Sequence, residues 1–159
     1  MTHSAPDTRE QASAQLPALH LLCNLGWRYL SSAHCLALRG STREVLLLPR
    51  LIETLQSRRF DYKGQTYPLS PSGIDQIVRE LSALPLGDGL LAANERLYHL
   101  LTLGITVTEF MPDGKKHQPT IAVIDWGDTA HNLWDITEEC EVLSTHGTHT
   151  RTPDIVGYV

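Results

Sequence analysis

The sequence lacks several features that would assign its class at once. It contains three cysteines, Cys23, Cys35 and Cys140, and none of them belongs to a CxxC motif. An odd number of widely spaced cysteines argues against a disulfide framework or a zinc ribbon and favours a reducing cytoplasm. No run of 18 apolar residues is present, so we expect no membrane span. The polar N-terminus also lacks the apolar core of a signal peptide.

Positive charge is also scarce. The 159 residues carry a net charge of −5, with an isoelectric point near 5.9. The chain is therefore no basic nucleic-acid arm, and any contact with DNA must come from a local patch or from partner subunits. The motif GxxxxGK[ST] is absent, so this chain is not expected to bind ATP through a phosphate loop. The length is that of one domain, which we place over residues 1–159.

Helical periodicity dominates the first two thirds of the chain. Helices are predicted over residues 10–24, over 42–57, from the cap at 70–72 to the break at 85–89, and over 90–103. Pro17 suits only a first turn, so the regular part of the first helix is expected to begin there. Pro49 lies within the second predicted helix, which should therefore kink or divide into two short helices. Residues 1–104 are thus predicted to be mostly helical.

After residue 104 the apolar period changes from 3.6 to 2. Residues 105–110 and 120–126 flank the turn 112–116, which predicts a hairpin. Residues 134–144 are expected to be extended, and a closing strand follows residue 154. Residues 105–159 are therefore predicted to form strands. Helices followed by strands predict an α/β (α+β) fold, in which N-terminal helices pack on a mixed sheet.

Asp154 is the strongest single candidate for a functional residue. A polar turn over residues 148–152 leads into Pro153 and Asp154, and an apolar strand follows. A carboxylate at the start of a buried strand must be paired, protonated or bound to metal, because an isolated buried charge is too costly. The alternative is an ordinary turn residue before a strand. Because an apolar strand is an unusual end for a domain, we expect the chain to be the front part of a longer protein.

Other groups have simpler interpretations beside a functional one. His146, His149 and Asp154 could form a metal site, but their spacing matches no known zinc motif, which favours solvated loop histidines. Asp125 and Asp128 could act as a carboxylate pair, although strand-end and turn residues look the same. The charged hairpin tip at residues 115–116 is either solvated or in contact with a DNA backbone.

Several segments together resemble a known family. Residues 22–30 (LCNLGWRYL) resemble the LxxLGYxYL opening of the R (restriction) subunit of type I restriction enzymes. Residues 43–47 (REVLL) resemble the helix that follows, and residues 104–107 and 123–126 resemble the hairpin of that family. Residues 152–156 match the first half of its RPDIVLFVNGLPLVVIExK region. No single motif is specific, but their order and spacing cover nearly the whole chain.

The resemblance implies an endonuclease of the PD-(D/E)xK type. Asp154 corresponds to the family's metal-binding and catalytic aspartate, with Mg²⁺ as the cofactor, and the Glu and Lys of the next strand would follow Val159. The chain would then hold an incomplete nuclease fold that is inactive alone. Glu10, on the first predicted helix, is a weaker candidate, because acidic residues there often assist in this fold and also suit any helix N-terminus.

The same resemblance implies the biological setting. The parent protein would be a cytoplasmic hydrolase of a restriction system that cleaves unmethylated foreign DNA. It would act with methylation (M) and specificity (S) subunits, while ATP would bind in motor domains outside this chain. The partners would thus be DNA and these subunits, with no membrane. The alternative is a non-catalytic docking fragment, in which residues 1–104 form a helical platform for partner subunits or for the motor domains.

Overall fold

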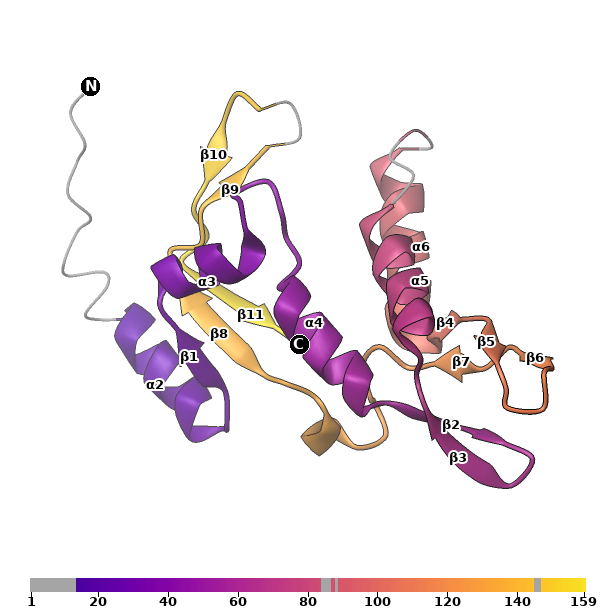
Figure 1. Ribbon diagram of the computed structural model, residues 1–159. Helices are drawn as coiled ribbons and strands as arrows, with labels where there is room; N and C mark the ends of the chain where they lie inside the picture. The colour runs from indigo at the N-terminus through magenta and orange to yellow at the C-terminus, as the bar shows by residue number, and fades with distance from the viewer. Residues whose placement is uncertain (1–13, 84–86, 88, 145–146) are drawn as a thin grey trace. The chain divides into compact units, whose positions relative to one another are not determined.

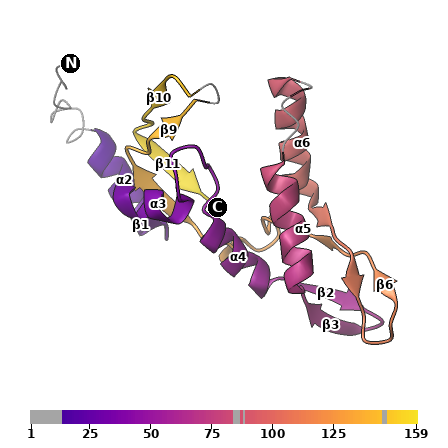
Figure 2. The same ribbon diagram turned by 45° about the horizontal axis from the view of Figure 1, so that its top comes forward.

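The computed structural model describes residues 14–83, 87, 89–144 and 147–159 (Figures 1 and 2). The contacts within the chain divide it into two compact units. Unit 1 comprises Met1–Leu48 and Leu133–Val159, and unit 2 comprises Pro49–Asn132. Unit 1 thus combines the two ends of the sequence, whereas unit 2 is one continuous segment.

A three-stranded mixed sheet forms the centre of unit 1 (Figure 1). Its strands stand in the order β1 (Arg28–Leu30), β8 (Asp135–Glu138) and β11 (Ile155–Tyr158). β1 runs parallel to β8 with Arg28 opposite Asp135, and β11 runs antiparallel to β8. A separate antiparallel pair consists of β9 (Val142–Leu143) and β10 (Thr150–Arg151).

Two helices of unit 1 flank β1 in the sequence. In α2 (Leu16–Asn24), Pro17 occupies the first turn, where its missing N–H costs no hydrogen bond. In α3 (Ser32–Arg39), the Ser31 hydroxyl accepts a backbone N–H of the first turn, and Gly40 ends the helix at a φ of 79°. Local capping residues therefore fix the bounds of α3.

The core of unit 1 lies between α3 and the sheet. Its buried residues are Leu30, Cys35, Leu47 and Cys140, and its partly buried members are Leu38, Val142, Val156 and Tyr158. Arg39 is also buried and contacts this core at Cys140. Its guanidinium donates to the backbone carbonyls of Thr42 (3.0 Å) and Glu141 (2.8 Å) and to Cys140 Sγ (3.1 Å). The guanidinium is therefore buried with hydrogen-bond partners, as a charged group requires.

Unit 2 is built from segments that pair with near neighbours in the sequence. Its helices are α4 (Leu48–Ser57, which begins at the boundary), α5 (Pro71–Ser82), α6 (Leu90–Leu103) and the 3₁₀ turn η3 (Thr129–His131). Its strands are β2 (Arg59–Tyr62), β3 (Gln65–Pro68), β4 (Ile105–Thr106), β5 (Glu109–Phe110), β6 (Lys116–His117) and β7 (Thr120–Ile121). They form three two-stranded pairs, β2–β3, β4–β7 and β5–β6.

Apolar side chains and one arginine hold unit 2 together. Leu55, Ile77 and Val107 are at most 1% exposed. Arg58 is buried beside them, and its Nη2 donates to the Val123 carbonyl (3.1 Å) and to Asn132 Oδ1 (2.9 Å). Burial lowers the pKa of Arg58, and the nearby carboxylate of Asp125 opposes this shift.

The mixed α/β class predicted from the sequence is confirmed. The helix after Ser70, the helix over 90–103 and the closing strand are also present. Among the described residues, no helix has both the length and the apolar character needed to cross a membrane.

Three details of the sequence interpretation were wrong. The helix expected over 42–57 begins only at Leu48, because Pro49 is accommodated in a first turn and not in a helix interior. α3 was not predicted, since its eight residues are too few for a clear periodicity. The strand expected over 120–126 covers only Thr120–Ile121, because the chain already bends at Val123 and Ile124.

Candidate functional site

Asp154 lies directly before β11, at one end of the sheet of unit 1. Its backbone carbonyl accepts two hydrogen bonds, from Gln15 Nε2 (2.9 Å) and from the Glu139 backbone N–H (3.1 Å). The side chain is exposed, and the strand that follows is not buried as the sequence predicted, because the residues of β11 are partly buried or exposed. The backbone of Asp154 is thus fixed from two sides while its carboxylate faces solvent.

A shallow depression adjoins this strand end. It has a volume of about 230 Å³, and its lining residues are Gln15, Leu16, Glu138 and Glu139. Two of these residues also hydrogen-bond the Asp154 carbonyl, so the depression borders the backbone of Asp154. Two glutamates therefore line a surface next to the backbone of Asp154. The sequence analysis did not single out Glu138 and Glu139, because their proximity to Asp154 depends on the pairing of β8 with β11.

One of these carboxylates is held by a residue of β1. The Tyr29 hydroxyl donates to Glu138 Oε1 at 2.6 Å. This hydrogen bond, together with desolvation and the charge of Glu138, raises the pKa of Tyr29 to about 12. The contact links the outer strand β1 to the end of β8 that faces Asp154.

An ion pair between exposed Arg28 and buried Asp135 joins β1 to the opposite end of β8. Arg28 Nε and Nη2 lie 2.7 and 3.1 Å from the two carboxylate oxygens of Asp135, which is 1% exposed. Trp27 packs against Trp134 with ring centroids 5.0 Å apart, and a Cβ at Gly157 would come within 2.8 Å of the Trp27 ring. These contacts set the register of all three strands and so place Asp154.

The remaining candidates lie elsewhere. Glu10 and His146 are outside the described residues, and His149 is exposed. Asp125 has a structural role, because its Oδ1 accepts the backbone N–H groups of Gly127 (3.0 Å) and Asp128 (2.9 Å). These bonds and a contact with His131 lower the pKa of Asp125. The interpretation of Asp125 and Asp128 as turn residues therefore agrees with the geometry.

A complete metal cage is not formed by the described ranges. Within residues 14–83, 87, 89–144 and 147–159, no three His, Cys, Asp or Glu side chains are grouped so that they could hold a metal ion. Magnesium does not need such a cage, since proteins usually bind it through one or two carboxylates, with water and substrate phosphates as the other ligands. The exposed carboxylate of Asp154 fits that donor set.

The architecture is a mixed α/β fold with an aspartate at the exposed end of an edge strand. The model of the type I restriction enzyme R protein N terminus matches residues 7–159, so the chain belongs to this family. The resemblance found in the sequence is thereby confirmed. A search of curated proteins gave no significant match.

Proposed function

We propose that this chain is part of the nuclease module of a type I R subunit and that Asp154 is its metal-binding aspartate. The observation that carries the proposal is the exposed carboxylate of Asp154 in a chain of this family, on a backbone that is fixed directly before β11 and beside the backbone of Glu138 and Glu139. The reaction is hydrolysis of phosphodiester bonds in unmethylated foreign DNA.

The proposed role of Asp154 is to supply one carboxylate ligand to Mg²⁺. The metal, when bound, would polarise a phosphoryl oxygen and lower the pKa of the attacking water. The chain itself contributes the position of Asp154, which the hydrogen bonds of Gln15 and Glu139 to its carbonyl fix. Among the described residues β11 pairs with one strand only, β8, so its other edge offers a place for the Glu and Lys strand that the family resemblance implies.

The proposed setting follows from the family. The parent protein acts in the cytoplasm as a hydrolase, in a complex with DNA and with the methylation and specificity subunits. ATP-driven translocation is assigned to motor domains outside this chain, whose sequence has no phosphate-loop motif. Cleavage is therefore coupled to DNA movement by the whole assembly.

A docking role is the second candidate, and α6 favours it. Leu90, Leu91, Tyr98 and Leu103 of this helix are each more than 60% exposed. Leu91 and Tyr98, seven residues apart, lie on the same face of this helix, and exposed apolar patches often mark contacts with other proteins. In this role unit 2 would bind a partner subunit or a motor domain without taking part in cleavage.

The decisive experiment uses the whole R protein assembled with its methylation and specificity subunits. Mg²⁺-dependent cleavage of unmethylated plasmid DNA is measured for the wild type, Asp154→Ala and Asp154→Asn, with ATP hydrolysis as a second readout. We expect both variants to lose more than about 100-fold in cleavage, because even indirect partners of a metal contribute 10- to 100-fold. ATP hydrolysis should stay near the wild-type rate.

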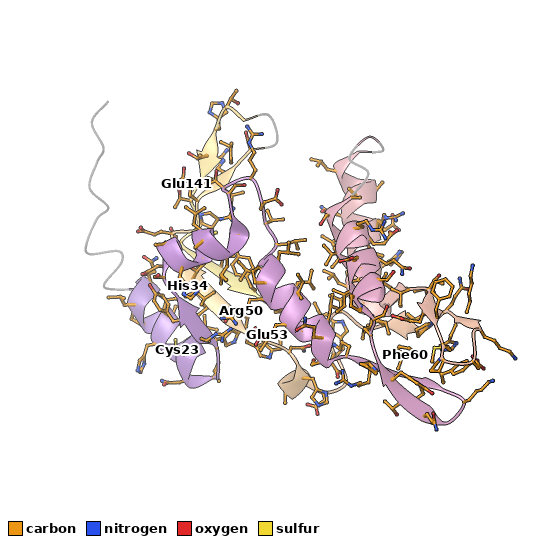
Figure 3. All side chains as sticks on the ribbon, viewed as in Figure 1. Cys23, His34, Arg50, Glu53, Phe60 and Glu141 are labelled. Atoms are coloured by element: carbon orange, nitrogen blue, oxygen red, sulfur yellow. The ribbon has the colours of Figure 1, made fainter. Side chains whose placement is uncertain are left out.

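Glu141→Ala is the matched control, because Glu141 is also an exposed carboxylate of unit 1 (Figure 3). It should cleave DNA like the wild type. Wild-type cleavage by Asp154→Ala would overturn the nuclease proposal. Loss of subunit assembly in Leu91→Ser, together with unchanged cleavage in Asp154→Ala, would instead support the docking role.

A further inference from the structure

All three lysines of the chain lie on two hairpin tips of unit 2. Lys63 is in the turn between β2 and β3, and Lys115 and Lys116 are at the turn between β5 and β6. The two hairpins lie at the same end of unit 2 in both views (Figures 1 and 2). We call Lys63, Lys115 and Lys116 the lysine surface. Lysines that are widely separated in the sequence are thus gathered in one place.

Direct contacts hold the two hairpins together. Lys63 Nζ lies 2.7 Å from Asp113 Oδ2, and the Tyr62 hydroxyl donates to the same oxygen at 3.0 Å. The Tyr62 ring packs on His117, with centroids 4.9 Å apart, and the Phe60 ring lies 5.7 Å from His117 (Phe60 is labelled in Figure 3). The lysine surface is therefore carried on one braced platform.

The electrostatics of the platform differ from those of the whole chain. The chain carries a net charge of −5. The two hairpins, residues 59–68 and 109–117, carry four positive and three negative side chains, a net charge of +1. At their tips Asp113 balances Lys63, whereas Lys115 and Lys116 are exposed and add positive charge. Phe110 beside them is 71% exposed, and Lys116 Nζ stands 5.6 Å from the centre of its ring. A local positive surface on an acidic chain complements a polyanion.

We propose that the lysine surface binds the phosphate backbone of DNA. This inference rests on the function proposed above, because it takes DNA as the substrate of the parent protein. Lysine ammonium groups act as flexible point charges that hold phosphates without reading sequence. The site is separate from Asp154, which belongs to unit 1, and it holds DNA and takes no part in bond cleavage.

The exposed ring of Phe110 allows single-stranded and duplex DNA to be distinguished as the source of the bound phosphates. Aromatic rings stack on the bases of single strands, whereas paired bases within a duplex are not available to them. If the surface holds single strands, Phe110 contributes to binding. If it holds duplex DNA, the lysines alone contribute, and Phe110 has no effect.

The test uses the whole R protein and two fluorescent probes, a 30-base-pair duplex without a recognition sequence and a single strand of the same length. Affinity is measured over a series of salt concentrations for the wild type and for Lys115→Gln/Lys116→Gln. On duplex DNA the slope of log K against log salt should fall by about 1.8, since each phosphate contact contributes about 0.9. If the two proteins bind equally at 1 M salt, each lost phosphate contact should make the variant bind roughly eightfold more weakly than the wild type at 0.1 M salt.

Arg43→Gln/Arg79→Gln is the control for net charge, because both arginines are exposed and lie outside the lysine surface. Its salt slope should equal that of the wild type. A wild-type slope and affinity in Lys115→Gln/Lys116→Gln on both probes would overturn the proposal. If the lysine surface holds single strands, Phe110→Ser should weaken binding to the single-stranded probe alone. The thermal unfolding of this variant must match that of the wild type.

Two further results separate this proposal from the nuclease proposal. Asp154→Ala should bind both probes like the wild type. If Asp154→Ala still cleaved DNA, the nuclease proposal would fail, but the effect of the lysine substitutions on DNA binding would be unaffected. If the lysine variant kept its DNA affinity but failed to assemble with the methylation and specificity subunits, the lysine surface would be a protein contact, and the DNA proposal would be wrong.

Discussion

The two units of this chain are stabilised by contacts of different range. In unit 1, β1 and β8 are more than 100 residues apart in the sequence, and the ion pair between Arg28 and Asp135 joins them. In unit 2, β2 and β3 are separated by a two-residue turn, and β5 and β6 by a five-residue turn. Long-range strand pairing must overcome the entropy of closing a long loop, whereas hairpins form locally. The candidate nuclease residue therefore lies in the unit that depends on distant contacts.

The largest expected effects come from truncating one buried isoleucine in each unit. Ile136 in β8 is 1% exposed and Ile77 in α5 is 0% exposed, so Ile136→Ala and Ile77→Ala should each lower the free energy of unfolding by about 2–5 kcal/mol. Native-state hydrogen exchange shows which segments lose stability. We expect faster exchange in β1, β8 and β11 for Ile136→Ala, and in α5 and the hairpins for Ile77→Ala.

A uniform rise in exchange across both units, for either substitution, would contradict this separation. It would mean that the two units unfold together in spite of their different internal contacts. The conservative pair Ile136→Val and Ile77→Val serves as the control, with a loss of about 0.5–1.5 kcal/mol each.

The same difference in range explains what the sequence could predict. The helix after Ser70, the helix over 90–103 and the turn near residues 112–116 depend on neighbouring residues, and all three were predicted. The order of the strands in the sheet of unit 1 was not predicted, because nothing in the sequence spacing of Arg28 and Asp135 indicates that these residues are in contact. Only the pairing of remote strands brings them together.

The candidate site shows the same limit. Asp154 was found from its place between a polar turn and an apolar strand, together with the family resemblance. Its neighbours Glu138 and Glu139 were not found, because their position beside Asp154 depends on the register of β8 with β11. Sequence reasoning thus found the residue, and the pairing of the strands defined its surroundings.

A smaller effect is expected from adding a methyl group at one glycine in each unit. A Cβ at Gly157 would meet the Trp27 ring in unit 1, and one at Gly73 would meet the Glu109 carboxylate in unit 2. Overpacking of this kind costs about 1–3 kcal/mol, so Gly157→Ala and Gly73→Ala should both unfold at lower urea concentrations. Tryptophan fluorescence of the folded state should change for Gly157→Ala, because Trp27 must move.

Gly127→Ala is the matched control, since its Cβ would stand 3.5 Å from the nearest atom, an ordinary contact. Its unfolding midpoint should stay within about 0.5 kcal/mol of the wild type. If Gly157→Ala were equally neutral, the close packing of Trp27 on β11 would be disproved. The end of β11 away from Asp154 would then lack one of its anchors.

The smallest effects concern two exposed hydrogen bonds, one in each unit, that respond to opposite ends of the pH scale. The hydrogen bond from Lys63 lowers the pKa of Asp113 to about 2. The folded carboxyl therefore binds a proton less tightly than an unfolded one, whose pKa is about 3.9. Stabilisation by this pair is present above about pH 4 and is lost as the pH falls toward 2. The Tyr29 hydroxyl, bonded to Glu138, behaves in the opposite way.

Because the pKa of Tyr29 is raised to about 12, the folded phenol holds its proton more tightly than an unfolded one, whose pKa is about 10. Its stabilisation is present below about pH 10 and is lost as the pH rises toward 12. Lys63→Met should return the Asp113 pKa toward its ordinary value in an NMR titration, and Glu138→Gln should do so for Tyr29 in an absorbance titration. An ordinary pKa for either group in the wild type would show that its contact does not form. Since Tyr29 links β1 to the end of β8 next to Asp154, its titration also reports whether the candidate site is assembled.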